Sequence, residues 1–428
     1  MHCQFRPLTT LSSKPNRAMR LLLITFSLLF GATLLRAEDA PTFRTDADGP
    51  VFASDNPNAK DKSGRPAWYQ LVDGRFPPEG SAHAISGELI QVDHLERRFL
   101  LRVDRNDSQD RGVWDLPVDG VMLPYGAIWQ HGSPAALQDI PLGTHLHGLF
   151  YLRAPDDKTP PPTVAYGRKT PEIEFRRCFL LEDDFSHYAK NKELWKVDSV
   201  DLAAKKLVAT LHRDGAMTGK PKTFDLLSST RVLQGNGFGT LESIQPGQSV
   251  LFNLTWCTLY GPGRVVEIWL DEASRQLAAA QQLERHRNHI RERGLAGWVD
   301  AVDDEAQVVT ITFFGGVDPK LFDELSLINP DPFGWPLLKP EANPLAPKGT
   351  ISVARESLMT YDPVNDRKGG NILEIKKVPV EPGGSGVQIR VQCDSLLEGY
   401  RPRRIVRFHP ATWKVVALPR EEQYSGRE

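Results

Sequence analysis

Three segments of the chain repeat the same alternation of hydrophobic and polar residues. Each has an alternating run, a polar turn and a second alternating run, which together predict a β-hairpin. The copies are Gly87–Asp93 before Arg98–Val103, Trp195–Asp201 before Lys206–Leu211, and Gly297–Asp303 before Gln307–Thr312. The aligned Val-Asp pairs begin at Val92, Val200 and Val302. The distance between copies is therefore the length of a small domain.

A second shared pattern follows each hairpin, in which a leucine and an isoleucine precede a proline, a glycine and a further strand. It stands at Leu137–Gly143 and Leu241–Gly247, and in a weaker form at Leu397–Pro402. Proline fixes φ and glycine accepts positive φ, so this pattern predicts a sharp turn into a strand. The third copy has Arg403 where the other two have glycine, which leaves closure of the third unit an open question.

Each unit has five or six short strands, enough to close a small barrel. We therefore predict a mainly β protein with three small OB-like or SH3-like barrels in tandem, joined by helical connectors. The alternative is one large sandwich spread over the chain. The predicted parts are a signal peptide (1–37), a linker (38–84), barrel unit 1 (85–184), unit 2 with its leading connector (185–272), a connector helix (273–294), unit 3 with a proline-rich insertion at 329–348 (295–418), and a flexible tail (419–428).

The connector at 273–293 is the clearest helix. It is rich in helix-forming residues, and Gly294 is expected to end it. Leu277, Ala280 and Leu283 form a thin apolar stripe that Ile290 extends by two turns, and we expect this side to pack on a barrel. His286 and His289 lie three residues apart among arginines, and we interpret them as part of a solvated helix face. A shorter helix is predicted over 185–193.

The first 37 residues predict a secretory signal. Basic residues precede a mostly apolar run at 21–35, and Ala37 stands where cleavage before Glu38 is allowed. The run is shorter than the ~20 residues that span a bilayer, so no membrane span is expected after removal. We expect a secreted or periplasmic protein.

Charge and cysteine content narrow the classes of function. Without the predicted signal the chain has 47 basic and 54 acidic side chains, a net charge of −7, so no nucleic acid partner is expected. Cys178, Cys257 and Cys393 lie too far apart for a usual zinc-ligand spacing. They are predicted to be buried thiols, with a single disulfide as the alternative.

The candidate chemistry centres on His145-Leu-His147. Alternate residues of a strand face the same side, so both imidazoles can reach one divalent metal, and His131 upstream can add a third ligand. The alternative is a polar strand face with hydrogen-bonded rings, since the matching strand of unit 2 has Ser249 and Leu251. No other cofactor is expected.

No catalytic motif stands out elsewhere. The acidic pairs Glu182/Asp183 and Asp271/Glu272 recur at the ends of equivalent strands, so we expect them to serve the turn into each connector. A second hypothesis is that loop aromatics form ligand-binding platforms, core packing being the alternative. These residues are Trp114, Tyr125, Trp129 and Trp335.

The threefold cycle of Val-Asp hairpin, Leu-x-x-Ile turn and closing strand, over roughly residues 85–418, resembles uncharacterised exported bacterial proteins built from small β-barrel (OB-like) repeats. The resemblance implies an extracytoplasmic array and brings no catalytic residues. We expect a secreted or periplasmic, non-enzymatic binding or scaffolding protein that presents its barrels to an envelope polysaccharide or a protein partner. The alternative is a metal-binding protein or metal-dependent enzyme with a His-x-His site in unit 1.

Overall fold

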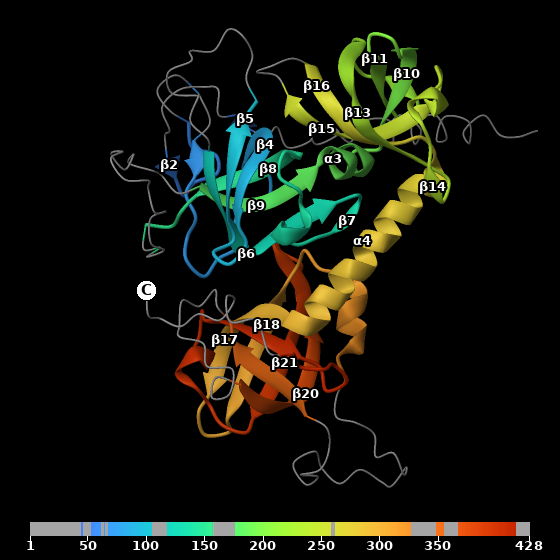
Figure 1. Ribbon diagram of the computed structural model, residues 1–428. Helices are drawn as coiled ribbons and strands as arrows, with labels where there is room; N and C mark the ends of the chain where they lie inside the picture. Colours follow the sequence, from blue (N-terminus) through green and yellow to red (C-terminus); the bar gives the residue numbers. More distant parts are fainter. Residues whose placement is uncertain are drawn as a thin grey trace, which may run out of the picture. The chain divides into compact units, whose positions relative to one another are not determined.

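The fold is seen in a computed structural model of the chain (Figure 1). It describes residues 44–45, 53–60, 64, 67–104, 118–155, 157, 176–257, 262–326, 348–354 and 367–416. The predicted signal peptide, Trp114, Trp335 and the predicted tail lie outside these residues, as does the proline-rich insertion apart from Lys348. Residues 43–428 group into one unit by their contacts.

Barrel 1 has five main strands, drawn from blue to green in Figure 1. They are β4 (His83–Asp93), β5 (Arg98–Val103), β6 (Val118–Gln130), β8 (His145–Leu152) and β9 (Arg176–Asp183). Their order around the barrel is β4-β5-β6-β9-β8, and the antiparallel pairing of β8 with β4 closes it. β6 and β9 run parallel, and β1 (Arg44–Thr45) and β7 (Ser133–Pro134) extend the sheet. β2 (Ala53–Ser54) and β3 (Trp68–Tyr69) form a separate pair.

Barrel 2 repeats this topology strand for strand. Its main strands are β10 (Glu193–Asp201), β11 (Lys206–Arg213), β13 (Lys222–Gln234), β15 (Ser249–Cys257) and β16 (Pro262–Trp269), with β12 (Ala216–Met217) and β14 (Gly237–Phe238) at the edges. The order is again first-second-third-fifth-fourth, closed by the pairing of β15 with β10. The third and fifth strands are again parallel. The first two sequence repeats therefore fold into the same OB-like barrel.

Barrel 3 closes with six antiparallel strands in a different order. They are β17 (Leu295–Asp303), β18 (Val308–Phe314), β19 (Gly349–Val353), β20 (Arg367–Lys377), β21 (Gly384–Cys393) and β22 (Ile405–His409), arranged β17-β18-β21-β20-β19-β22. The predicted fold class, three small closed barrels in tandem with few helices, is confirmed. The single large sandwich is wrong.

The same turn closes all three barrels. Residues Gly143, Gly247 and Arg403 have positive φ values of 89°, 89° and 69°. Their main-chain N–H groups donate to the carbonyl oxygens of Leu89, Val197 and Val299, at 2.7, 2.7 and 2.8 Å. Arg403 thus adopts the left-handed conformation that glycine favours, and the third barrel closes without a glycine there.

Two α-helices begin at equivalent aspartates. α3 (Asp184–Lys190) follows Asp183 and α4 (Glu272–Arg293) follows Asp271. Each aspartate accepts a hydrogen bond at 2.8 Å, from the main-chain N–H of Ser186 and Ser274 respectively, as an N-cap does. The acidic pairs therefore serve the turn into each connector, as predicted. Short 3₁₀ turns complete the connections: η2 (Leu137–Asp139), η3 (Leu241–Ser243), η4 (Pro319–Glu324) and η7 (Glu398–Tyr400).

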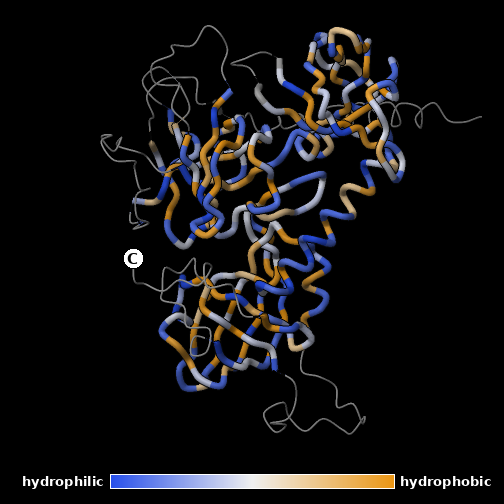
Figure 2. Tube along the Cα trace, viewed as in Figure 1, coloured by the Kyte–Doolittle hydropathy of each residue, from blue (hydrophilic) through white to orange (hydrophobic). Residues whose placement is uncertain are grey.

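The buried face of α4 differs from the predicted apolar stripe. The helix ends at Gly294 as predicted, but its buried residues are Ser274, Ala278, Gln282 and His286. Figure 2 shows α4 as largely hydrophilic along its length. Ile290 packs against the core of barrel 3, as predicted, but Leu277 and Leu283 are only half-buried and Ala280 is exposed. This part of the stripe is wrong because α4 meets polar groups of barrel 1. The Gln282 amide donates to the Pro134 carbonyl at 3.3 Å, and the hydroxyl of Ser133 donates to the Ala279 carbonyl at 2.8 Å. The solvated face predicted for His286 is likewise wrong.

Each barrel has its own apolar core. Cys178 and Cys393 are buried free thiols in the cores of barrels 1 and 3, as predicted. A further apolar cluster joins barrel 1 residues such as Tyr125 to barrel 3 residues such as Phe314. Among the helices that the structure describes, we find none with the length and apolar character of a membrane span.

Candidate metal centre

Strand β8 positions the two histidines of the His-x-His pattern. Leu146 points into the core of barrel 1 and is fully buried. Its neighbours His145 and His147 therefore point out of the barrel, because side chains alternate along a strand. This outer face is covered by α3 and by β15 of barrel 2. The histidines thus lie at the junction between the first two barrels.

Asp184, the first residue of α3, meets both imidazoles. Its Oδ1 atom lies 2.7 Å from Nδ1 of His145 and 2.9 Å from Nε2 of His147. One donor atom from each of the three residues lies within 4.8 Å of the others. Asp184 has no exposed surface, and His145 is 4% exposed. Two imidazole nitrogens and a carboxylate oxygen therefore converge at a largely buried position.

Each of these three side chains also contacts a second partner through its other nitrogen or oxygen atom. The other ring nitrogen of His145, Nε2, contacts Asp104 Oδ2 at 2.8 Å, and Nδ1 of His147 contacts the Ser86 hydroxyl at 3.0 Å. The second oxygen of Asp184 accepts a hydrogen bond from the main-chain N–H of Leu254 in barrel 2, at 2.9 Å. Outer partners of this kind orient metal-ligating histidines and carboxylates. The donor atoms of the three groups are thereby turned toward one another.

The electrostatics of the site follow from burial and from these contacts. Burial of His145 opposes its charge, but the carboxylates of Asp184 and Asp104 outweigh burial and raise its pKa well above the ordinary value. Burial lowers the pKa of His147. Burial of Asp184 also opposes its charge, but the two histidines hold its pKa well below its ordinary range. The positive charge of His145 is therefore favoured by its contacts with Asp184 and Asp104.

His187 lies against one side of the site. Its ring stacks on His147 with centroids 3.8 Å apart, and its Nδ1 contacts Glu182 at 2.9 Å. Lys190 adds an ion pair to Glu182 at 3.3 Å. Burial of Glu182 opposes its charge, but His187 and Lys190 outweigh burial and lower its pKa. This group screens His147, whose side chain is 19% exposed.

His131, the third ligand that the sequence suggested, lies outside the cluster. Its main-chain N–H donates to Asp183 at 3.1 Å, and its ring contacts Glu267 of barrel 2 at 3.3 Å. The ring also packs edge-on against Trp269, with centroids 4.9 Å apart. The structure brings His145 and His147 together and provides Asp184 as the third donor instead.

Sequence reasoning missed Asp184 and Asp104. β8 and β9 pair antiparallel with Leu146 opposite Asp183, so the end of β9 brings the next residue beside the histidines. A prediction of that strand pair and its register would have placed Asp184 there.

Two of the four residues predicted to form aromatic platforms, Tyr125 and Trp129, lie among the described residues. Tyr125 is buried and packs against Phe76, Trp298 and Phe314. Trp129 is half-buried near the end of β6, opposite Pro134. The two residues therefore belong to different surroundings.

Comparisons with known proteins give little support for any assignment. No family model and no curated protein matches this chain. A solved structure of a CusF variant with Cu(II), residues 10–88 from Escherichia coli, aligns with 19% of this chain and 90% of its own at 14% identity. The TM-score is 0.14, and the proposals below do not depend on this alignment.

Proposed function

We propose that this protein is an exported binding protein that holds one divalent transition-metal ion between His145, His147 and Asp184. The observation that carries the proposal is that each of the three side chains has two contacts, one within the cluster and one with an outer partner. One atom of each faces the other two groups, and the second atom is held by Asp104, Ser86 or the Leu254 amide. Outer partners of this kind hold metal ligands in place, which is why we favour a bound ion over an unoccupied polar face.

The donor set favours a metal of intermediate softness. Imidazole nitrogen suits zinc, copper, nickel and iron, and a carboxylate oxygen is compatible with all of them. In a tetrahedral zinc site with bonds of about 2.0 Å, the donors lie roughly 3.3 Å apart. The observed 2.7 and 2.9 Å contacts to Asp184 are within a small shift of that spacing. Three protein donors leave a fourth position for water or for a group from a ligand.

The site also suits a role in holding the array together. Asp184 belongs to the connector after barrel 1, and the amide that holds it belongs to barrel 2. An ion bound here would fix the first two barrels in one arrangement.

We further propose export through the signal at 1–37, and an envelope polysaccharide or a protein as the partner of the exposed barrel surfaces. Array proteins bind extended partners through several weak contacts.

The test measures bound metal in the purified full chain. The protein is stripped with a chelator, dialysed against Zn²⁺ and analysed by mass spectrometry for zinc content. We expect one zinc ion per chain, lost in the His145→Ala/His147→Ala double variant and in Asp184→Asn. The matched control is His212→Ala in barrel 2, whose exposed ring contacts the Gly215 carbonyl and should leave zinc content unchanged.

Stability gives an independent readout of the same site. A ligand present at 100 times its dissociation constant stabilises the folded state by about 2.7 kcal/mol, so chelation should lower the melting temperature of the wild type. The double variant should show no such shift. A wild type that binds no zinc, or one whose zinc content survives in the double variant, would contradict the proposal. The cluster would then be a buried ion network joining two barrels.

A further inference from the structure

Solvent reaches the three donor side chains of the metal centre to different extents. The side chain of Asp184 is 1% exposed and that of His145 is 6% exposed, whereas that of His147 is 19% exposed. The first two are enclosed because α3 and β15 cover this face of barrel 1. We therefore expect an ion to reach the cluster along the ring of His147.

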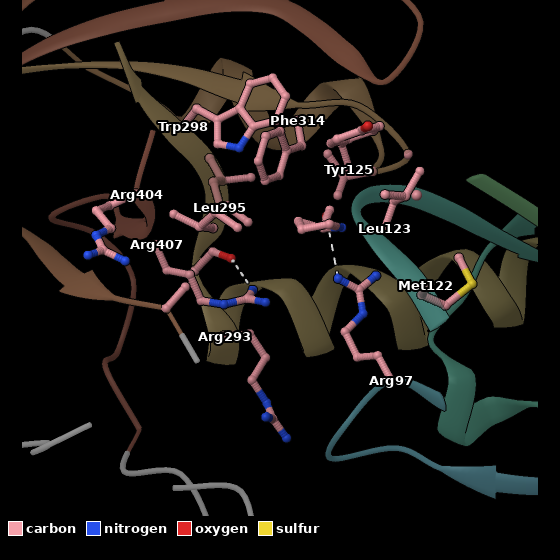
Figure 3. A pocket seen from close by; sticks show the side chains of 18 of the residues that line it. Arg97, Met122, Leu123, Tyr125, Arg293, Leu295, Trp298, Phe314, Arg404 and Arg407 are labelled. Atoms are coloured by element: carbon pink, nitrogen blue, oxygen red, sulfur yellow. Dashed lines mark hydrogen bonds between the residues drawn. The ribbon is translucent and has the colours of Figure 1, made fainter. Parts of the chain in front are cut away.

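A large cavity elsewhere in the described part of the chain is not this route. It has a volume of about 1070 Å³ and lies between barrel 1, barrel 3 and the C-terminal half of α4. Figure 3 shows its aromatic wall, formed by Tyr125, Trp298 and Phe314. The described residues that line it include neither the three donors nor His187. The approach to the metal centre thus lies on the side of barrel 1 that α3 covers.

The ring of His187 covers His147 on this side. Asp184 and His187 are three residues apart on α3, so the helix presents both side chains on one face. The ring of His187 stacks on that of His147, with centroids 3.8 Å apart and planes 13° from parallel. The His187 side chain is itself 30% exposed. It therefore forms a layer between the imidazole of His147 and solvent.

Tyr188, the next residue of α3, also borders His147 but is anchored in barrel 2. Its ring centroid lies 6.1 Å from that of His147 and 5.5 Å from that of Trp195. Tyr188 packs against the apolar core of barrel 2, where Trp195 is buried. Movement of Tyr188 would disturb that core, whereas the side chain of His187 can turn toward solvent. His187 is thus the cover that can move.

Glu182 holds the ring of His187 in place. It lies on β9 directly opposite His147 of β8. Its Oε1 atom contacts Nδ1 of His187 at 2.9 Å, and its Oε2 atom accepts a hydrogen bond from Lys190 at 3.3 Å. If the ring of His187 turns away, Glu182 loses one hydrogen bond but keeps its ion pair with Lys190. Opening therefore does not leave this buried carboxylate without a partner, which would be costly.

We propose that His187 is a gate that controls how fast the metal ion enters and leaves. The proposal rests on the function proposed above, since it requires an ion between His145, His147 and Asp184. In the closed state the ring of His187 lies on His147, and the ion passes when this side chain turns toward solvent. Stacking uses the face of the His147 ring and not its Nε2 atom, which contacts Asp184. The gate can therefore close over both the metal-free and the metal-bound site.

A gate has a kinetic signature that a metal ligand lacks. It lowers the rates of uptake and release by the same factor, because it favours neither the free nor the bound state. Its removal therefore leaves the dissociation constant unchanged. A side chain that binds or orients the metal would instead change the dissociation constant.

The test measures zinc exchange in the purified full chain. Release is followed by mixing zinc-loaded protein with an excess of a chromogenic chelator, and uptake by mixing stripped protein with Zn²⁺ and a fluorescent zinc indicator. We expect His187→Ala to raise both rates roughly tenfold, as for loss of one hydrogen bond to a charged group, with the dissociation constant of the wild type. Glu182→Gln keeps the ring but weakens its attachment, so both rates should rise by a smaller factor.

Two further variants complete the set. Phenylalanine retains an aromatic cover over His147 without Nδ1, so His187→Phe should exchange zinc more slowly than His187→Ala and faster than the wild type. The matched control is His212→Ala in barrel 2, which should exchange zinc at the wild-type rates. Melting temperatures of the stripped proteins show whether each variant is folded, and Glu182→Gln tests the gate if His187→Ala does not fold.

The outcomes distinguish the gate from the proposed metal site. A wild type that binds no zinc would contradict both. Zinc binding by the wild type with equal exchange rates in His187→Ala would overturn the gate alone. A raised dissociation constant in His187→Ala, with an unchanged rate of uptake, would also overturn the gate, because His187 would then act on the bound state.

Discussion

At the scale of single residues, Gly247 of barrel 2 and Arg403 of barrel 3 occupy equivalent turns. Both have positive φ, 89° and 69°. A Cβ atom in this region costs roughly 1 kcal/mol. A Cβ added to Gly247 would meet no atom within 4 Å. Substitution at Gly247 therefore tests backbone conformation separately from packing.

We predict that Gly247→Ala lowers the free energy of unfolding by about 1 kcal/mol, because alanine is strained at this φ. Arg403→Gly should change it by less than about 0.5 kcal/mol, since relief of strain is offset by the greater freedom of glycine in the unfolded chain. The Arg403–Asp73 ion pair is exposed at 3.5 Å and contributes little. Urea unfolding measures both changes. Equal effects of the two substitutions would refute this interpretation of the turn.

At the scale of elements, barrels 1 and 2 end in helix caps with equivalent hydrogen bonds. Asp271 accepts the Ser274 N–H and also the N–H of Gly235, the first residue after β13, at 2.8 Å each. Asp183 accepts the Ser186 N–H and the N–H of His131, the first residue after β6, at 2.8 and 3.1 Å. Each aspartate thus joins a helix start to the hairpin that follows the third strand of its barrel.

We predict that Asp271→Ala lowers the free energy of unfolding by about 1–2 kcal/mol at pH 7, the usual range for loss of an N-cap. Burial of Asp271 opposes its charge, but the Ser274 and Gly235 amides outweigh burial and lower its pKa. Because the folded pKa lies below the unfolded one, this stabilisation is present above about pH 4 and is lost as the pH falls further. Thermal unfolding of both proteins between pH 3 and 7 measures the difference. A gap between them that stays constant with pH would refute the charge contribution.

The prediction from sequence was most successful where the pattern is local. Alternation along Gly87–Asp93 and its copies predicts the hairpins, and the Leu-x-x-Ile turn predicts where each barrel closes. The i, i+2 rule correctly places His145 and His147 on one side of a strand. Asp184 was missed because it reaches them through the pairing of β8 with β9, which is a long-range contact. The buried face of α4 was missed because hydrophobic periodicity assumes an apolar partner, whereas α4 meets polar groups of β7.

At the scale of the whole molecule, the barrels are joined by contacts of different kinds. Barrels 1 and 2 meet through buried polar groups, among them Asn253, which donates to Asp183 and accepts the Phe185 N–H at 2.9 Å each. Barrels 1 and 3 meet through aromatic side chains. Trp298 lies 4.6 Å from Phe76 and 5.2 Å from Tyr125 between ring centroids. The two junctions should therefore respond differently to truncation of an aromatic residue.

We predict that Trp298→Ala destabilises the protein by about 2–3 kcal/mol, somewhat less than a fully buried tryptophan because Trp298 is half-buried. The loss should concentrate at the junction of barrels 1 and 3, detected as faster amide exchange in Phe76, Tyr125 and Phe314. The control is Phe238→Ala, since that ring is 79% exposed and should contribute little. Faster exchange spread evenly over all three barrels would contradict this assignment.

The carboxylate of Asp183 has a consequence for how the chain unfolds. It accepts hydrogen bonds from the cap of α3, from the His131 hairpin of barrel 1 and from Asn253 of barrel 2. If the start of α3, the His131 hairpin or the Asn253 segment opens, the buried Asp183 carboxylate loses a hydrogen bond. The first two barrels should therefore behave as one cooperative unit, losing their amide protection together. In a nascent chain, barrel 2 can dock only after β9 has formed, which gives the assembly a direction from the N-terminus onward.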